Sequence, residues 1–354
     1  MSNSRPLVAV TGLEGRDNPY PGAAIARALR EARGDGVGVI GFSYDPALTG
    51  NFRGDLFDRV HSTPLPGAPA AALIPRLLEI HRQEPIDVLI PALDSELALF
   101  SEHAAELAAA GIRMLIPSPG TVKKRYKQRL WPWARAHGLF SPRTEVVTDP
   151  ASFWRQEDWS FPCYLKGPLA DAVRVESQAE AEAVYQRLAA RWGLPVLAQE
   201  PLCGEEFDVC AVVRPGGEPL SMITIRKTAL SAAGKAVGAE VVDEPEAEAE
   251  ARRILAALEW AGPLELELLR ERSSGRYFLI EINARFPAWI GVSGATGVNL
   301  PDLLLRLALG EELPEIPAPR VGTTFLRASR TTLGRVEQLG ALLSSGSLVH
   351  QEPL

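Results

Sequence analysis

The sequence lacks the features that mark membrane, secreted or nucleic-acid-binding proteins. No apolar run among its 354 residues is long enough to span a bilayer. The start, Met-Ser-Asn-Ser-Arg-Pro, leads directly into a strand pattern and has none of the apolar stretch of a secretory signal. The formal net charge is -7, whereas a nucleic-acid partner would favour a basic face. We therefore expect a cytoplasmic protein without a membrane or nucleic-acid partner.

Cysteine and histidine are also scarce. The 3 cysteines, Cys163, Cys203 and Cys210, form no Cys-x-x-Cys pair, and the 5 histidines are scattered without metal spacing. An odd, small number of cysteines is typical of buried free thiols in a reducing compartment. What the chain has in quantity is apolar sequence, at 46% of residues, and its length suggests two or three domains.

Strand and helix patterns alternate over the first third of the chain. This alternation predicts a parallel, doubly wound sheet, so the fold class expected here is α/β. The expected strands are 7–12, 37–42, 59–61, 86–91 and 113–117, and the expected helices are 23–32, 71–82 and 95–109.

Two short motifs lie at strand ends in this region. Gly12-x-x-Gly15 is not the Gly-x-Gly-x-x-Gly dinucleotide fingerprint and favours a tight strand-to-helix turn. Asp94, Ser95 and Glu96 follow a strand, where ligands of open α/β sheets tend to bind. They are candidates for the substrate site, and the alternative for Asp94 or Ser95 is a helix N-cap.

A hairpin from residue 263 to residue 285 carries the densest functional pattern. Alternation in its first strand, 263–270, places Glu265 and Glu267 on one face. In its second strand, 276–285, Leu279, Glu281, Asn283 and Arg285 would share one face, opposite 278, 280, 282 and 284. Pairing of the two strands would therefore bring three carboxylates together.

Carboxylate and amide oxygens are ligands that Mg²⁺ favours, and Arg285 would then reach a phosphate. The alternative is an amphipathic hairpin with a solvated outer face, which is the commoner origin of a Leu-Glu-Leu-Glu sequence.

At this hairpin the chain resembles the ATP-grasp superfamily, whose magnesium strands have a Glu, a turn, and then Glu-x-Asn-x-Arg. Glu267, Glu281, Asn283 and Arg285 match that pattern one by one. The resemblance extends over nearly the whole chain and is greatest to the carboxylase, carbamoyl-phosphate and carboxylate-amine ligase branches. It implies ATP as cofactor and Mg²⁺, with Mn²⁺ as an alternative, on Glu267, Glu281 and Asn283.

The resemblance also implies two phosphate-binding lysines. Lys127 lies in the basic stretch 122–129, where relatives open a helix with a lysine, and Lys124 is the alternative because Tyr126 replaces the usual aspartate. A solvated basic helix face is a further alternative for this stretch. Lys166 ends the strand 161–166, where relatives have their second phosphate-binding lysine. The resemblance implies a catalytic role for it together with Arg285.

A glycine-rich flap should follow Lys166, but residues 167–173 contain one glycine, and Pro168 has no N–H to donate. Either water then reaches the phosphates when no acceptor is bound, or their cover comes from a second subunit, from a bulky substrate or from elsewhere in the chain, for example from residues 229–238 with Gly234 and Lys235.

The nucleotide contacts implied by the resemblance lie around residue 200. Gln199, Glu200 and Leu202 would face adenine, Glu206 would hold the ribose, and Lys227, directly after the hairpin 206–226, would approach the phosphates. A charged turn is the alternative for Glu206.

The expected organisation is a Rossmann-like domain (1–117), two ATP-grasp subdomains (118–195 and 196–320) and a C-terminal tail (321–354). In the loop after Arg285, Trp289 and Ser293 are candidates for substrate contact, with packing as the alternative for Trp289. The implied function is an ATP-dependent ligase that activates a carboxylate as an acyl phosphate and joins it to an amine, an amino acid or a peptide. The alternative is a nucleotide-binding regulatory or partner subunit without turnover, and a homodimer is left open.

Overall fold

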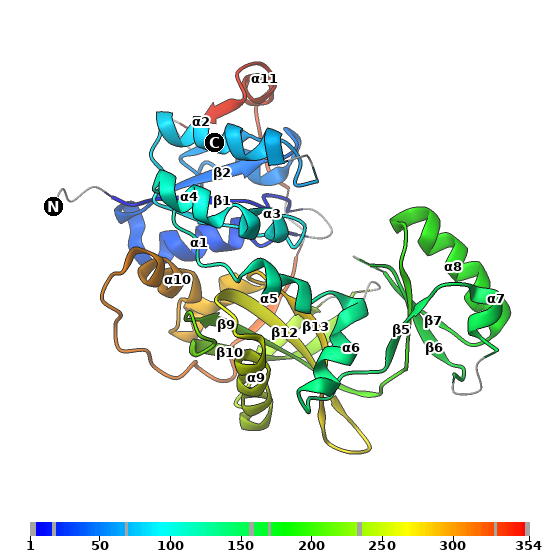
Figure 1. Cartoon of the computed structure of the whole chain (residues 1–354). Coiled ribbons are helices and arrows are strands. Elements are labelled where there is room, and N and C mark those ends of the chain that lie inside the picture. Colours follow the sequence, from blue (N-terminus) through cyan, green and yellow to red (C-terminus); the bar gives the residue numbers. More distant parts are fainter. Residues whose placement is uncertain are drawn as a thin grey trace.

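A computed structural model describes residues 5–15, 19–67, 70–155, 159–168, 171–231, 236–328 and 331–350. These residues form three sheets, and the chain passes through them in the order N-terminal sheet, small sheet and central sheet before returning to the first (Figure 1). Among the described residues, no helix combines the length and the apolar character that crossing a membrane requires.

The N-terminal sheet has the strand order β15-β3-β2-β1-β4. Its parallel part confirms the predicted α/β fold, and the antiparallel β15 was not predicted. Val8 and Val10 of β1 face one core and Ala9 faces the other, as expected of a strand covered on both sides. Its elements are β1 (Leu7–Val10), α1 (Gly22–Arg33), β2 (Gly38–Ser43), β3 (Arg59–Ser62), α2 (Ala70–Gln83), β4 (Val88–Ile90), α3 (Leu97–Glu102), α4 (Ala104–Ala110) and the C-terminal β15 (Ser347–Val349).

Two expectations for this region were wrong. The segment 95–109 forms two helices, α3 and α4, rather than one. The segment 113–117 is not a strand, because it pairs only through Arg113, which bridges to Val88. Leu115 has already left the sheet, since its carbonyl lies against Gly262, where an added Cβ would come within 2.3 Å of that oxygen.

The small sheet is antiparallel and has the order β5-β8-β6-β7. Its four strands are β5 (Thr144–Val147), β6 (Cys163–Lys166), β7 (Ala172–Val175) and β8 (Val196–Gln199), and α7 (Pro150–Phe153) and α8 (Gln178–Trp192) cover it. Ser177 caps α8 by accepting from the backbone N–H of Glu180, and Gly193 ends the helix at a φ of 76°. This unit projects from the rest of the molecule (Figure 1). The predicted boundary at residue 195 separates β8 from the sheet to which it belongs.

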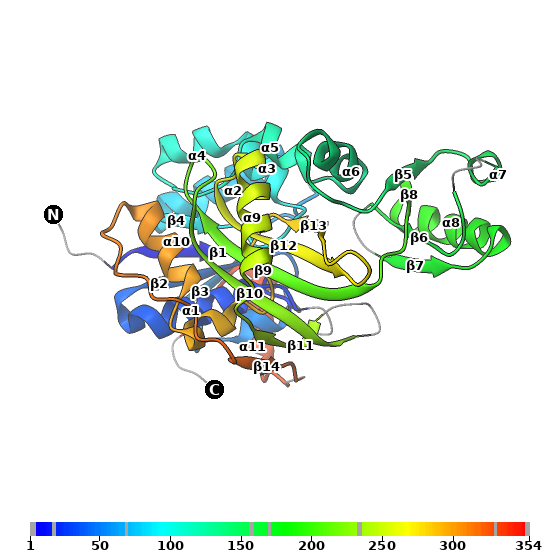
Figure 2. The same ribbon diagram turned by 90° about the horizontal axis from the view of Figure 1, so that it is seen from below.

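The central sheet is antiparallel throughout, with the order β13-β12-β9-β10-β11-β14. Its strands are β9 (Gly204–Val213), β10 (Pro219–Leu230), β11 (Ala236–Val241), β12 (Gly262–Glu271), β13 (Tyr277–Asn283) and β14 (Thr324–Leu326). Helix α9 (Pro245–Leu258) lies along one face (Figure 2), together with α5 (Pro119–Lys124) and α6 (Lys127–Ala136). The predicted single basic helix over 122–129 is therefore two helices, broken at Arg125 and Tyr126.

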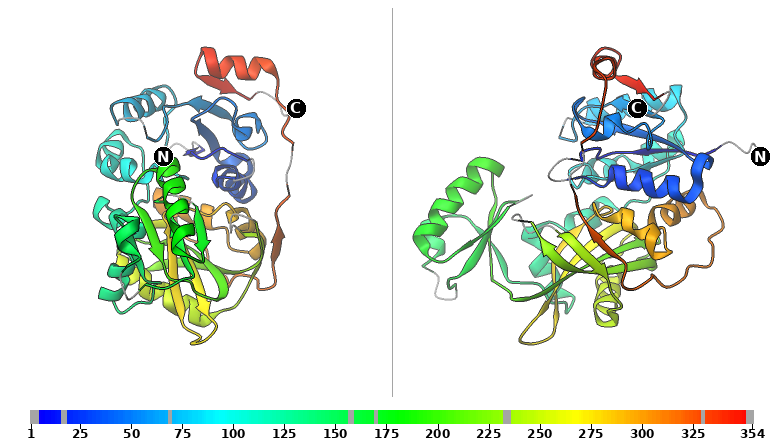
Figure 3. Two further views of the ribbon diagram at one scale, coloured as in Figure 1. Left: turned by 90° about the vertical axis from the view of Figure 1, so that its right-hand side faces the viewer. Right: turned by 180° about the vertical axis from the view of Figure 1, so that it is seen from behind.

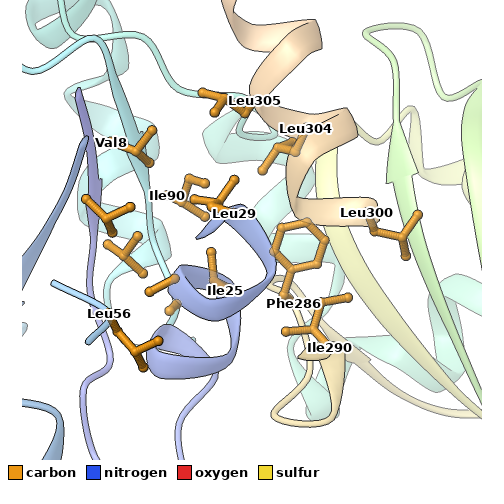
Figure 4. Close-up of a cluster of buried hydrophobic side chains, with 14 of the residues drawn as sticks. Val8, Ile25, Leu29, Leu56, Ile90, Phe286, Ile290, Leu300, Leu304 and Leu305 are labelled. Carbon is orange, nitrogen blue, oxygen red and sulfur yellow. The ribbon is translucent and has the colours of Figure 1, made fainter. Parts of the chain in front are cut away.

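The opposite face of the central sheet changes character along β9. Val212 and Cys210 are buried in the core that the central sheet shares with the N-terminal sheet, whereas Asp208 and Glu206, on the same face, carry charge. That shared core contains α1, α10 (Leu300–Leu309) and the segment after β13 (Figure 4). The charged end of the face begins where this apolar cover stops. Cys203, expected to be buried, is exposed, while Cys163 and Cys210 are buried as predicted.

The C-terminal tail connects two sheets. Strand β14 pairs with β11 at one edge of the central sheet, and β15 pairs with β3 at the edge of the N-terminal sheet. Between them the chain runs along the outside of the molecule to α11 (Val336–Ser344) (Figure 3).

Candidate active site

The charged end of the central sheet is a surface of carboxylates, an amide and a lysine, which we call the charged face. Strand register sets it: Glu267 lies opposite Glu281 on one side and opposite Asp208 on the other, and Glu265 lies opposite Asn283. Residues directly opposite in an antiparallel pair point to the same side of the sheet. The charged face consists of Glu206, Asp208, Lys227, Glu265, Glu267, Glu281 and Asn283.

A β-bulge modifies the predicted face of β13. The register between β12 and β13 shifts after Glu267, so that Leu279 pairs with Leu268 and Ile280 is the additional residue. Leu279 is 1% exposed and lies in the core on the α9 side of the sheet. The sequence pattern predicts the opposite side for it, beside Glu281. Because of the bulge, Glu281 and Asn283 lie on the charged face while Leu279, earlier in the same strand, lies in the core on the other side.

Glu265, Glu267 and Asn283 are joined by hydrogen bonds. The Asn283 amide donates from Nδ2 to Glu265 Oε2 at 3.0 Å and to Glu267 Oε1 at 2.9 Å. Burial and the neighbouring Glu267 raise the pKa of Glu265. Burial acts the same way on Glu267, but Lys227 and the hydrogen bond from Asn283 outweigh it and lower the pKa of that carboxyl.

Lys227 lies in β10, which continues to Leu230, and not after the hairpin as expected. Its ammonium is 3.0 Å from Glu206 Oε2, 3.1 Å from Asp208 Oδ1 and 3.3 Å from Glu267 Oε2. Burial lowers the pKa of Lys227, but the carboxylates of Glu267, Asp208 and Glu206 outweigh burial and raise it. Asp208 was missed by sequence reasoning, although its position two residues after Glu206 in a strand would have placed both on one face.

Two further lysines face this surface from outside the central sheet. Lys127 opens α6 and its Nζ lies 3.3 Å from Glu281 Oε1. Lys166 ends β6, and burial together with the neighbouring Lys127 lowers its pKa. Within the part of the chain that the structure describes, the Lys166 ammonium has no hydrogen bond or ion pair. Lys124, the alternative to Lys127, donates to the Leu258 carbonyl at 3.2 Å and points away from the charged face.

Arg285 is held by groups from both sheets. Its Nε donates to Asp94 Oδ2 at 2.9 Å, one Nη donates to the Phe286 carbonyl at 3.2 Å, and the other donates to Asn283 Oδ1 at 3.2 Å. Asp94 also accepts from Arg125 and from the backbone N–H of Ala284. The expected N-cap role is therefore wrong, since Glu96 is the N-cap residue of α3 and makes no side-chain cap. Asp94 instead links the N-terminal sheet to the charged face.

Comparison with known proteins places this geometry in a family. Residues 194–330 match the family model described as ATP-grasp in the biosynthetic pathway with Ter operon. The L-amino acid ligase from Bacillus licheniformis is 20% identical with a TM-score of 0.63, and the match covers 86% of this chain and 74% of that one. Biotin carboxylase from Campylobacter jejuni is 14% identical with a TM-score of 0.69, covering 90% of this chain and 74% of that one.

The N5-carboxyaminoimidazole ribonucleotide synthetase from Thermotoga maritima is 16% identical with a TM-score of 0.62, covering 90% of this chain and 78% of that one. Residues 194–330 belong to an ATP-grasp family, and the chain as a whole has the ATP-grasp fold. The superfamily resemblance seen in the sequence is confirmed, and the assignment of the small and central sheets to the two ATP-grasp subdomains stays a prediction.

The segment that connects the small and central sheets contains the predicted nucleotide contacts. Gln199 ends β8 and donates from Nε2 to Thr144 Oγ1 at 2.9 Å, so its side chain is already used within the small sheet. The Glu200 carboxylate accepts from the backbone N–H of Arg143 at 2.8 Å. The Glu200 N–H also donates to the Arg143 carbonyl at 3.0 Å. The adenine contacts of Gln199, Glu200 and Leu202 stay a prediction.

The flap of this ATP-grasp fold is a short hairpin between β6 and β7. The Gly167 N–H donates to the Asp171 carbonyl at 3.1 Å, and Asp171 has a φ of 65°. The Gly167 N–H is thus used inside the turn, and Pro168 has none to offer a phosphate. Leu169 and Ala170 of the flap, and Gly234 and Lys235 of the alternative cover, lie outside the described residues.

Trp289 and Ser293 follow Arg285, with Trp289 just before the 3-10 helix η3 (Ile290–Thr296) and Ser293 within it. Trp289 is 4% exposed, donates from Nε1 to Glu265 Oε1 at 2.7 Å and stacks on Phe325 with ring centroids 6.5 Å apart. The packing alternative for Trp289 thus describes its place in the structure, and its indole also fixes Glu265. Ser293 is 0% exposed.

The donor set of Glu267, Glu281 and Asn283 suits Mg²⁺, because all three supply hard oxygen ligands. In the structure, lysine ammonium groups lie against both carboxylates, at 3.3 Å in each case, and the Asn283 oxygen accepts from Arg285. Among the described residues, no three His, Cys, Asp or Glu side chains are grouped as a metal site. Glu267, Glu281 and Asn283 would hold a cation, and the oxygens that would do so are the ones that Lys127, Lys227 and Arg285 contact in the structure.

Proposed function

We propose that the protein is an ATP-dependent ligase that activates a carboxylate as an acyl phosphate and joins it to an amine. The observation that carries this proposal is the convergence of Lys127, Lys166 and Lys227 on Glu267 and Glu281 within an ATP-grasp fold. Three cations beside two metal-type carboxylates are what a transferring phosphoryl group needs, because its catalysis depends on positioning and electrostatics.

In the proposed reaction, a carboxylate oxygen of one substrate attacks the γ-phosphorus of ATP, and ADP leaves with the bridging oxygen. The amine nitrogen of the second substrate then attacks the acyl carbon, phosphate leaves with its oxygen, and the nitrogen loses a proton. Mg²⁺, when bound, would supply charge neutralisation between the phosphates. Lys166 would bind the phosphates, and Glu267, Glu281 and Asn283 would hold the metal. An amino acid or peptide is the substrate class we propose, with a homodimer as the proposed assembly.

Incubation with MgATP and pools of L-amino acids and peptides, with phosphate release and product mass as readouts, tests this function. We expect ADP and phosphate to appear in equal amounts with one acid–amine pair, together with a product of the condensed mass. ATP binding without consumption in any pool would contradict the ligase and support a regulatory or partner subunit.

The short flap gives this assay a second expectation. Because the 167–171 turn uses its first N–H internally, water should reach the phosphates when the acceptor is absent. We expect measurable ATP hydrolysis without an acceptor. Stationary ATP in that control would show that the phosphates are covered by another segment.

A further inference from the structure

Two guanidinium groups, those of Arg285 and Arg327, come near the inner carboxylates of the charged face, and they differ in how they are engaged. Every nitrogen of the Arg285 side chain has a protein partner: Asp94, the Phe286 carbonyl or Asn283. Its Nη1 is also 3.5 Å from Glu265 Oε2. Each nitrogen of Arg285 is thus engaged by at least one protein group, with which an anionic substrate would have to compete.

Arg327 approaches the same carboxylates from the C-terminal tail. In β14, Phe325 lies opposite Ala239 of β11, and Ala239 lies opposite Lys227 of β10. These three residues share the charged side of the sheet, as the stacking of Phe325 on Trp289 confirms. Arg327 is two residues further on, so alternation puts it on the same side, whereas Leu326 points outward and is 81% exposed.

The described surroundings of Arg327 provide no direct ion pair for its guanidinium. Burial lowers the pKa of its guanidinium, and the attraction of Glu265 and Asp208 only partly opposes that shift. Its backbone N–H donates to the Val237 carbonyl at 2.8 Å, which fixes the main chain. Among the residues that the structure describes, the Arg327 side chain has no hydrogen bond and no ion pair. A half-buried cation without a direct partner is costly, and an incoming anion would remove that cost.

The position of Arg327 selects the part of a substrate that it could meet. Two strand spacings, about 10 Å, separate β10 with Lys227 from β14. Arg327 therefore lies to the side of the lysines, two residues beyond Phe325, whose ring stacks on Trp289. Under the proposed function, a substrate group that lies beyond the phosphates on that side would meet Arg327.

We propose that Arg327 binds a carboxylate of the amino-acid or peptide substrate and is the tail's contribution to the substrate site. The inference rests on the proposed function for the identity of the substrate. A guanidinium is suited to this task because its planar fork matches both oxygens of a carboxylate.

Melting of the wild type and of Arg327→Gln in MgADP, with each common L-amino acid and dipeptide added separately, tests the proposal. We expect at least one of these to raise the wild-type Tm, and Arg327→Gln to need about ten to a hundred times more of it for the same rise. Arg327→Lys should recover part of the loss, because it keeps the charge without the fork. Leu326→Gln, on the opposite side of the same strand, should respond like the wild type.

Each outcome decides the proposal. An equal response of Arg327→Gln and wild type, or no wild-type response to any amino acid or dipeptide, would overturn it. If Arg327→Gln melts without cooperativity, the Arg327→Lys titration carries the test, with about a tenfold shift expected. The phosphate-release assay is separate: a ligand that binds through Arg327 but is never turned over would contradict the ligase and leave the carboxylate site standing.

Discussion

The lysines Lys166 and Lys227, which face the same site from the small and central sheets, lie in opposite electrostatic surroundings. Lys227 is 5% exposed and touches three carboxylates, which raise its pKa. Lys166 is desolvated beside Lys127 and its pKa is lowered. The central sheet thus balances the charge of Lys227, whereas Lys166 of the small sheet has no direct ion pair among the described residues and is attracted by Glu281, Glu267 and Glu206 without contact. One side of the site is therefore preorganised, and under the proposed function a phosphate would complete the other.

The largest effect on activity should come from replacing a proposed metal ligand in the central sheet. We expect Glu281→Ala to lower ATP turnover by about a hundredfold or more, because it removes an oxygen ligand that faces Lys127. Phosphate release under saturating MgATP measures the loss. Glu271→Ala, at the half-buried far end of β12, is the matched control and should keep wild-type turnover. Wild-type turnover in Glu281→Ala would show that the metal site lies elsewhere.

Removing the cation of the balanced side should cost stability. In Lys227→Met the carboxylates of Glu206, Asp208 and Glu267 lose their shared partner, and we expect the free energy of unfolding at pH 7 to fall by about 3 kcal/mol. A raised lysine pKa contributes stability that is complete below its unfolded value of about 10.4, so the deficit should persist across neutral pH. It should shrink in acid, where the carboxylates take up protons. Urea titrations at several pH values check this, and an unchanged midpoint would contradict the charge balance.

Replacement of Lys166, the lysine on the unbalanced side, by Met should leave the stability of the protein unchanged and weaken ATP binding instead. Lys166→Met removes a desolvated cation without a protein partner, so we expect no loss of unfolding free energy. ATP should bind about tenfold more weakly, while adenosine should bind as before, because the ammonium meets only the phosphates. Calorimetric titrations with both ligands separate the two effects. Equal weakening of ATP and adenosine would indicate misfolding.

The smallest expected effect is a proton taken up with ATP. Since the pKa of Lys166 is lowered in the free protein, the group loses its proton at a lower pH than an ordinary lysine, and phosphate binding should restore it. ATP binding should therefore take up a fraction of a proton that grows as the pH rises above neutrality. Calorimetry in buffers of different ionisation enthalpy measures it. Lys166→Met should abolish the uptake, and Lys123→Met, at an exposed position, should retain it.

From the sequence alone, the functional residues of the hairpin could be predicted, but most of their contacts with other segments could not. The Glu-x-Asn-x-Arg pattern and strand alternation placed Glu267, Glu281 and Asn283 on one face, because cross-strand neighbours follow from local periodicity. The prediction from alternation was wrong at Leu279, because the bulge at Ile280 moves Leu279 to the other side of the sheet. Such a bulge cannot be recognised from the amino-acid pattern of the strand.

The remaining differences all depend on contacts between distant segments. Asp94 meets Arg285 across 191 positions of the chain, and β14 pairs with β11, which lies far before it in the sequence. Neither pairing has a periodic signal, so each was read locally as a cap or as a tail without chemistry.

The closing of the N-terminal sheet by the tail has a consequence for the order of events during synthesis. Strand β3 takes its outer partner from β15, and the hydrogen bond between His61 and Ser347 joins residues 286 positions apart. The strands β1 to β4 leave the ribosome early, with the outer edge of β3 open to pairing with other chains throughout the translation of the rest. The nascent chain therefore carries an unprotected sheet edge until a segment 286 positions further along has been made and seals it.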